Sequence, residues 1–204
     1  MRRSKEDSLK TRRSIVLAAR RVFAKRGVSQ TSMEHIASSA GVSRGAIYGH
    51  FKDKGELFQT MREQVRLPLM DVLNEAMLHS PADPLAGVER YLLAVVDAVR
   101  NDPATRDTFQ ILTFKCEYVG DFEADIKRQA ARLAELAAEL ERVYRAASRY
   151  GQFRKGVAPR LAALETCAFL MGTMRLWLLD ADGVLVRKDA AKLMRAHVAN
   201  LRAR

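Results

Sequence analysis

The side chains most able to recognise another molecule lie together in residues 43–50. Ser43, Arg44, Tyr48 and His50 offer hydrogen-bond donors, and Gly45 leaves room for a partner to come close. Arginine binds guanine edges through two parallel hydrogen bonds, while hydroxyl groups and cations contact phosphate oxygens. On the outer face of one helix, these residues would form a surface suited to reading double-stranded DNA.

Two short helices around a tight turn would place those donors on the outside. Gly41 supplies the turn, and apolar residues recur at helical spacing on either side of it. A small helical hairpin of any function could show the same stripe, so the spacing alone leaves DNA binding and ordinary packing open. The expected inward-facing residues are Ile36, Ala37 and Ala40 on the first helix and Ala46, Ile47 and Phe51 on the second.

The literal sequence of this stretch narrows the choice. From Lys10 to Phe58 it resembles, position by position, the DNA-binding region of TetR-type bacterial transcriptional regulators. This resemblance implies a three-helix, helix-turn-helix DNA-binding domain in residues 1–58. The matching residues are Ile36-Ala37, Ala40-Gly41-Val42-Ser43, Gly45, Tyr48, His50-Phe51, Lys54 and Leu57.

The same resemblance assigns a role to each of eight side chains, and these roles are implied by the family rather than by the spacing. Thr31 or Ser32 caps the first helix of the pair and contacts phosphate, Ser43, Arg44 and Gly45 approach base edges, and Tyr48, His50 and Lys54 hold the phosphate backbone.

Much of the positive charge of the chain lies in its N-terminal quarter. The whole chain has 35 Lys or Arg and 24 Asp or Glu, a formal net charge of +11. Residues 1–54 hold thirteen Lys or Arg against four Asp or Glu. A solvated basic face or a membrane-surface patch is an alternative. Because the basic residues directly precede the helix pair, we favour a polyanion that releases counterions when it binds there.

The rest of the sequence predicts an all-α protein with about nine helices. With 204 residues and 48% hydrophobic content, the chain can bury a full core. The N-terminus lacks an apolar signal region, and Glu165 and Arg175 interrupt the longest apolar run, so we expect neither secretion nor a membrane span. Residues 59–204 are expected to form a helical ligand-binding and dimerisation domain.

The helices outside the helix-turn-helix pair are predicted from the spacing of apolar residues and from Gly and Pro residues at the helix ends. Pro68 is expected to kink or interrupt the helix that begins at Lys54 and connects the two domains. The expected helices cover about residues 9–26, 54–79, 85–100, 104–118, 121–150, 159–179 and 187–202.

Catalysis, metals and cofactors find little support in the sequence. There is no Gly-rich phosphate loop. Cys116 and Cys167 lie in apolar helical settings without zinc spacing, which suits a reducing cytoplasm and favours packing over a redox-sensor role. The four histidines fall on separate segments without metal-binding spacing: they are His35, His50, His79 and His197.

The helix expected at residues 159–179 is hydrophobic nearly all round, so it needs cover on two sides. One side would pack within the chain. The other is expected to meet a second copy, together with the helix at 187–202, in a two-fold four-helix interface. The alternative is the buried central helix of a monomer. A dimer is favoured because it places two recognition helices roughly 34–36 Å apart on one face of DNA.

One face of that helix also carries adaptable Met and Trp side chains, a pattern more often found in a core than in a pocket. Residues 109–119, FQILTFKCEYV, and residues 176–179 resemble, more loosely, the ligand domain of AcrR-type regulators of multidrug efflux operons. That resemblance implies a large apolar cavity. The candidate lining residues are Val88, Tyr91, Leu92, Val95, Phe109, Thr113, Cys167, Leu170, Met171 and Met174.

Together with these patterns, the two resemblances imply a bacterial, cytoplasmic homodimer that represses transcription from a palindromic DNA operator and is associated with the nucleoid while bound. A small hydrophobic effector would release it, and a multidrug efflux operon is the expected target. Few acidic residues fall on the predicted inner faces, so an uncharged or anionic aromatic effector fits better than a cation. The alternatives are a TetR-type regulator of another metabolic or stress operon, a sequence-neutral DNA-coating protein, and an enzyme of unknown type.

Overall fold

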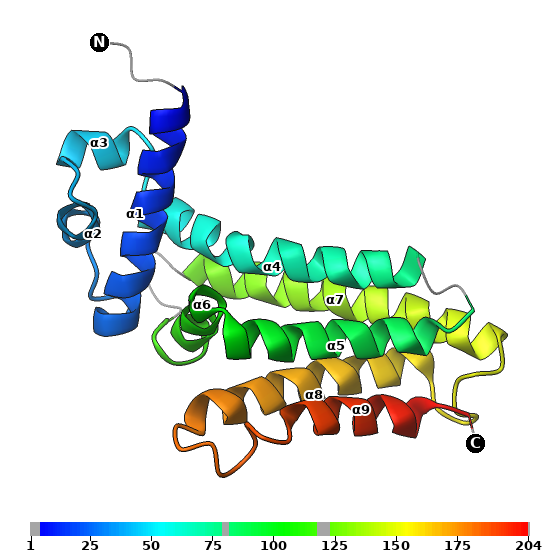
Figure 1. The fold of residues 1–204 in the computed structure, drawn as a ribbon. Helices are drawn as coiled ribbons and strands as arrows, with labels where there is room; N and C mark the ends of the chain where they lie inside the picture. Colours follow the sequence, from blue (N-terminus) through cyan, green and yellow to red (C-terminus); the bar gives the residue numbers. More distant parts are fainter. Residues whose placement is uncertain (1–4, 79–81, 118–122, 204) are drawn as a thin grey trace. The chain divides into compact units, whose positions relative to one another are not determined.

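In a computed structural model, which describes residues 5–78, 82–117 and 123–203, the chain is all-α, as the sequence predicts. Within these ranges it forms nine helices and no β-strand (Figure 1). The one β-type contact in the same ranges is an isolated antiparallel bridge between Phe153 and Arg202. The helices are α1 (Lys5–Arg26), α2 (Met33–Ala40), α3 (Arg44–Tyr48), α4 (Lys54–Leu78), α5 (Pro84–Asn101), α6 (Pro103–Phe114), α7 (Glu123–Arg149), α8 (Pro159–Leu179) and α9 (Ala190–Leu201).

The helix ends differ from the predicted ones where a side chain caps the backbone. Asp102 accepts hydrogen bonds from Ala104 N and Thr105 N, which starts α6 at Pro103. Asp180 binds the backbone N–H groups of residues 184–187, so those groups are held in a loop and α9 begins only at Ala190. The predicted ends at residues 79, 118 and 121 lie outside the described residues.

The chain divides into two compact units, and each contains sequence-distant segments. The first unit combines Met1–Leu67 with Asp102–Ala124, and the second combines Pro68–Asn101 with Asp125–Arg204. Helix α4 runs through Pro68 without interruption, and the units divide at that residue. Helix α6 thus belongs with the helix-turn-helix. The functional boundary predicted between residues 58 and 59 stays a prediction.

In the first unit, α1 packs against both α2 and α6 (Figure 1). Its inner face contributes Ile15, Ala19 and Phe23, all fully buried. The ring of Phe23 meets the ring of Phe58 edge to face, with centroids 5.8 Å apart. Burial of large apolar side chains such as Ile15 and Phe23 stabilises the unit by about 1.5–3 kcal/mol each.

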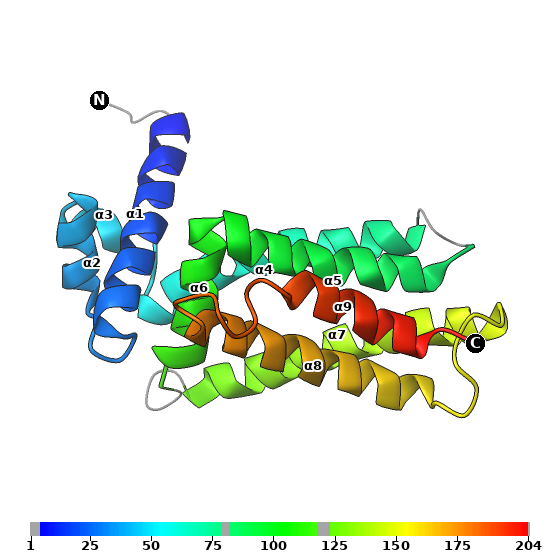
Figure 2. The ribbon, with the colours of Figure 1, turned by 60° about the horizontal axis from the view of Figure 1, so that its bottom comes forward.

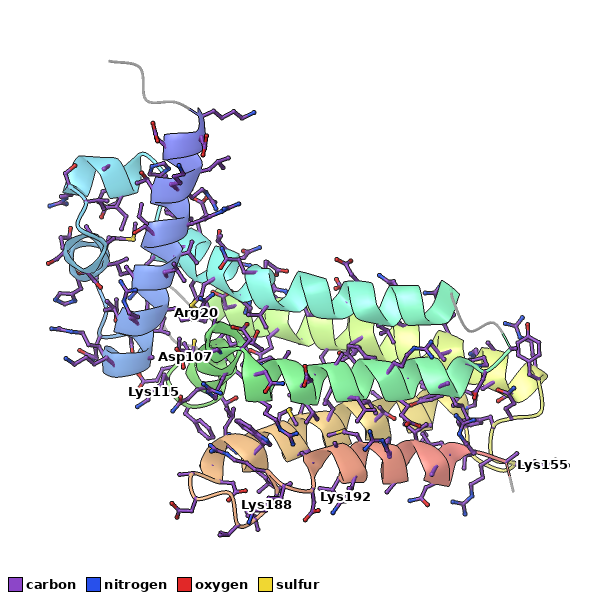
Figure 3. The ribbon with its side chains drawn as sticks, viewed as in Figure 1. Arg20, Asp107, Lys115, Lys155, Lys188 and Lys192 are labelled. Atoms are coloured by element: carbon purple, nitrogen blue, oxygen red, sulfur yellow. The ribbon has the colours of Figure 1, made fainter. Side chains whose placement is uncertain are left out.

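A buried arginine fastens α6 to α1. Arg20, only 4% exposed, donates from Nε to Thr108 Oγ1 at 3.1 Å and from Nη2 to Gln64 Oε1 at 3.2 Å. Burial lowers the pKa of Arg20, while the charges of Asp102 and Asp107 oppose that shift. Figure 3 shows Arg20 beside Asp107 where the two helices meet. Because the guanidinium joins three segments, α6 is a structural part of the first unit.

In the second unit, α9 packs against both α5 and α8 (Figure 2). A buried polar network joins α7, α8 and α9: Tyr144 Oη lies 2.7 Å from Thr166 Oγ1, which lies 2.8 Å from His197 Nε2. The Thr166 hydroxyl also donates to Ala162 O at 2.8 Å, so Tyr144 and His197 act as donors to it. Burial lowers the pKa of His197, although Glu165 opposes this, so burial favours the neutral imidazole.

Helix α8 is the one described helix that is long and apolar enough to cross a membrane by composition, with a mean hydropathy of 1.3. Core helices meet the same criterion. Its inner face is buried within the second unit at Ala163, Cys167 and Met174, which is the packing of a core helix.

Candidate functional site

The helix-turn-helix is defined by local caps and one left-handed glycine. The hydroxyl of Ser32 accepts a hydrogen bond from His35 N at 3.2 Å at the start of α2. Gly41 ends α2 with a φ of 67°, a conformation that favours glycine. Ser43 Oγ then accepts a hydrogen bond from Ala46 N at 3.2 Å and starts α3. The predicted turn at Gly41 is confirmed, and Ser32 rather than Thr31 is the cap.

Most residues predicted to face inward in this motif are buried, and most of those predicted to face outward are exposed. Ile36, Ile47 and Phe51 are at most 1% exposed and pack in the core of the first unit. On the outside, the side chain of Arg44 is 74% exposed and Tyr48 is 44% exposed. The donors therefore face solvent on a helix whose inner face is fixed.

Arg44 is held in place by two neighbours before any partner binds. Its Nε lies 3.5 Å from Glu34 Oε1 on α2, and its guanidinium lies 5.8 Å from the centre of the Tyr48 ring. Hydrogen bonds from the backbone and from Ser32, with a smaller contribution from Arg44, lower the pKa of Glu34. Such an exposed ion pair contributes little stability, but it presents the guanidinium at the surface of the motif.

Nothing in the described structure requires a glycine at position 45. A Cβ built on Gly45 would meet no atom within 4 Å, and its backbone is not in the left-handed region. Glycine within a helix is less stable than alanine by roughly 0.5–1 kcal/mol. The glycine therefore fits a surface that another molecule approaches closely.

We expect Gly45→Ala to raise the free energy of unfolding by up to about 1 kcal/mol, because it reduces the freedom of the unfolded chain. The added methyl would also occupy the space of an approaching base edge, so affinity for DNA should fall. Urea unfolding and fluorescence anisotropy with a labelled operator measure the two effects. Unchanged DNA affinity in the stabilised variant would remove Gly45 from the interface.

Thr31 and Lys54, predicted to contact phosphate, both have internal partners. Thr31 is 3% exposed, and its hydroxyl donates to Gly27 O at 2.7 Å. Lys54 Nζ donates to Val28 O at 3.0 Å and to Ser29 O at 3.4 Å. Both side chains hold the segment between α1 and α2, which places Ser32 at the head of α2. His50 is partly exposed at the end of the motif.

Three further residues position this surface and were not identified from the sequence. His35 Nδ1 accepts from Ser32 N at 3.2 Å and completes a capping box, in which Glu or Gln is the usual partner. Arg12 of α1 stacks 4.3 Å from the centre of the Phe51 ring. Asp53 Oδ1 accepts from Glu56 N at 2.8 Å at the start of α4. The three-residue spacing of Asp53 and Glu56 is a pattern typical of a helix N-terminus, so this cap could have been predicted from the sequence.

The candidate effector residues fall into three groups in the structure. Phe109 and Thr113 lie partly buried on α6, in the first unit. Met171 is 50% exposed and lies about 100° around α8 from Leu170, at the border of the buried face, so its contact with an effector stays a prediction. The remaining seven are buried on α5 and α8 of the second unit: Val88, Tyr91, Leu92, Val95, Cys167, Leu170 and Met174.

The two cysteines differ in their surroundings and neither forms a disulfide. Cys116 is partly buried in the first unit. Cys167 is buried on α8, and burial raises the pKa of its thiol to about 11. A thiol with so high a pKa is a poor nucleophile. In the described part of the chain, no group of three or more His, Cys, Asp or Glu could hold a metal ion.

Two family models match the chain. Residues 15–61 match bacterial regulatory proteins of the tetR family. Residues 83–202 match the C-terminal region of MAATS-type transcriptional repressors. The first match spans α2 and α3 with parts of α1 and α4, and the second runs from α5 to α9.

Similar proteins and structures extend over nearly the whole chain. The transcriptional repressor BepR of Brucella suis biovar 1 (strain 1330) is 31% identical over 203 residues, which cover 100% of this chain and 97% of BepR. NalD, the secondary repressor of the MexAB-OprM multidrug efflux pump in Pseudomonas aeruginosa, has a crystal structure that matches with a TM-score of 0.85 and 32% identity, covering 97% of this chain and 98% of NalD.

A ligand-bound structure is also similar. The complex of SmeT with triclosan matches with a TM-score of 0.84 and 26% identity, covering 95% of this chain and 92% of that one. SmeT is the repressor of the Stenotrophomonas maltophilia multidrug efflux pump SmeDEF.

Proposed function

The chain belongs to the TetR family of bacterial regulatory proteins, and we propose that it represses a multidrug efflux operon until a small hydrophobic effector releases it from a palindromic operator. The observation that carries DNA binding is the recognition helix α3, whose donors are exposed while Gly45 leaves its surface open. The efflux target is supported by NalD and SmeT, which both repress efflux pumps. We place the protein in the bacterial cytoplasm, on the nucleoid when it is bound.

In this proposal, Ser32, Tyr48, His50 and Lys54 contact the DNA backbone. Ser43, Arg44 and Gly45 approach base edges, and Arg44 reads a base. The caps matter because they fix where α2 and α3 begin, which places Ser32 and Ser43 at the start of each helix. Lys54 would have to leave or share its carbonyl partners to reach phosphate. Its loss should therefore affect both folding and binding.

The effector is proposed to bind among the buried apolar residues of α5 and α8, which include Tyr91, Val95, Leu170 and Met174. Phe109 and Thr113 of α6 stay predicted contacts. Triclosan, which SmeT binds, is an uncharged aromatic compound of the kind that the sequence favours. A ligand signal would reach the first unit through α4 and through the junction of α5 with α6 at Asp102.

The homodimer is proposed to form through the outer faces of α8 and α9. Five large apolar side chains of α8 are between 46% and 62% exposed, and Leu193 of α9 is 37% exposed. By contrast, Val198 is fully buried, so a charge there would test the fold and not the interface. The exposed apolar residues of α8 are Leu161, Leu164, Met171, Leu176 and Leu179.

Two variants distinguish a side chain that reads a base from one that contacts the DNA backbone. Arg44→Ala is expected to cost about 1–3 kcal/mol on the operator and little on scrambled DNA. Tyr48→Phe should weaken both complexes alike, because a phosphate contact carries no sequence information. Binding would be measured across a salt series with an operator located by footprinting upstream of the neighbouring genes. Equal losses on both DNAs for Arg44→Ala would contradict its base-reading role.

The same titration tests a sequence-neutral DNA-coating protein. A repressor keeps a specificity ratio well above unity as salt rises, whereas a coating protein loses affinity for both DNAs in parallel. If the footprints lie only upstream of an operon of another metabolic or stress function, the regulated operon is not an efflux operon. The proposed repressor mechanism would still hold.

A further inference from the structure

Trp177, the one tryptophan of the chain, carries a buried donor without a partner. The side chain is 4% exposed on the inner face of α8. Among the residues that the structure describes, none accepts a hydrogen bond from its indole Nε1. Buried tryptophan N–H groups usually find an acceptor, and leaving one unpaired costs stability. The N–H group is thus open to an acceptor that the described residues do not supply.

The position of Trp177 joins this donor to the candidate effector residues. Cys167, Leu170 and Met174 lie ten, seven and three residues before it on the same buried face of α8. At helical spacing these side chains form one stripe. Cys167, Leu170 and Met174 offer no strong hydrogen-bond donor, so the indole N–H is the main donor of this stripe, although the same buried face of α8 also carries Thr166 and Thr173. A site of this kind uses few polar groups to orient an apolar ligand.

Arg187 fixes the indole ring from one side. Its guanidinium carbon lies 4.4 Å from the ring of Trp177, and its Nε donates to Trp177 O at 3.1 Å. The backbone N–H of Arg187 donates to Asp180 Oδ2 at 2.8 Å. The ring face is therefore occupied, and the ring edge that carries Nε1 is held in one orientation.

The N–H donor and the guanidinium beside the ring disfavour a cationic ligand, although the ionised Asp180 offsets part of the positive charge. Asp180 accepts four backbone hydrogen bonds, from the N–H groups of residues 184–187, at 2.8–3.0 Å. Burial opposes its ionisation, yet these donors outweigh burial and hold its pKa at about 2. Its carboxylate is thus committed to the loop, while the guanidinium of Arg187 lies against the indole ring. A cation would meet a positive charge and an N–H donor here.

We propose that Trp177 Nε1 donates a hydrogen bond to the effector, and that the effector is an aromatic compound with a neutral or anionic oxygen acceptor. This inference rests on the proposed effector site of the second unit and adds its orienting contact. It predicts that a two-ring phenol or ether binds more tightly than a hydrocarbon of similar shape, because only the oxygen compound satisfies the buried N–H.

The test replaces Trp177 in the full-length protein with benzothienylalanine, an isostere in which sulfur stands for the N–H. Two probes are titrated by calorimetry: 2-phenoxyphenol, which carries oxygen acceptors, and diphenylmethane, which carries none. We expect the isostere to bind 2-phenoxyphenol roughly 2- to 12-fold more weakly, the range of one neutral hydrogen bond. Affinity for diphenylmethane should not change. In the unmodified protein, 2-phenoxyphenol should also shift the emission of the single tryptophan.

Thermal unfolding without ligand separates this role from a structural one. Removing an unpaired N–H should leave the Tm unchanged or raise it, whereas a lower Tm would show that the N–H already has a partner and would overturn the proposal. Equal weakening of both probes, or of neither, would also overturn it, as would no binding of 2-phenoxyphenol to the unmodified protein. If 2-phenoxyphenol binds through Trp177 but leaves operator affinity unchanged, the contact stands and the effector-released repressor is wrong.

Discussion

Met171→Glu is expected to split the dimer and to lower operator affinity roughly 10²- to 10⁴-fold, the range by which linking two binding modules raises avidity. Met171 is half exposed in the single chain and lies on the apolar stripe proposed to meet a second copy. A carboxylate in that interface would lose its hydration without gaining a partner. The monomer would still fold, because the inner face of α8 is unchanged, but it would contact only one half-site.

Sedimentation velocity and operator titration measure the two effects on the same samples. Leu193→Glu should act in the same way from α9. Ala138→Glu adds the same charge to an exposed position of α7 and serves as the control, with dimer and operator affinity both retained. A Met171→Glu protein that sediments as an intact dimer would place the interface elsewhere on the molecule.

The helix-turn-helix was predictable because its determinants are local. Gly41 and Ser43 act on their own backbone or within three residues, and the apolar stripe of α2 and α3 needs no knowledge of distant segments. The capping role of His35 was missed because histidine is not the usual residue at that position. The outward face of α3 was equally readable, since each donor follows from the period of a single helix.

The faces of α8 were harder to assign, and the reason is geometrical. Successive residues of a helix are about 100° apart, so Leu170 is 7% exposed while its neighbour Met171 is 50% exposed. When a helix is apolar nearly all round, the pattern cannot say which stripe faces the core. The sequence therefore predicted two apolar faces on α8 but placed Met171 with the inner residues.

Long-range partners account for the remaining differences. The buried contact of Arg20 with Thr108 joins residues 88 positions apart, and a basic residue on an N-terminal helix reads as surface in the sequence. Asp180 likewise determines where α9 starts through N–H groups up to seven residues away. Neither contact repeats with a helical period, so neither could be found by pattern.

Effector binding is expected to weaken operator binding about 5- to 150-fold, the usual range of coupling between two sites, and operator DNA must weaken effector binding by the same factor. The coupling arises if the effector favours a dimer whose recognition helices no longer match the half-site spacing. Leu170→Gln should remove the response, because an amide without partners in the apolar stripe disfavours a hydrophobic ligand. Operator affinity without effector should stay near that of the unmodified protein, since α3 is untouched.

Triclosan titrations with and without saturating operator give one coupling factor, and operator titrations with and without saturating triclosan give the other. Circular dichroism confirms that Leu170→Gln is folded. The conservative Leu170→Met keeps the volume and apolar character of the side chain, so it should retain the response and thereby shows that polarity, not substitution itself, removes it. Because the two factors must be equal at equilibrium, a disagreement would mean that the two titrations do not share one binding stoichiometry. Tight triclosan binding with a coupling factor of one would show that α5 and α8 hold a ligand without controlling the recognition helices.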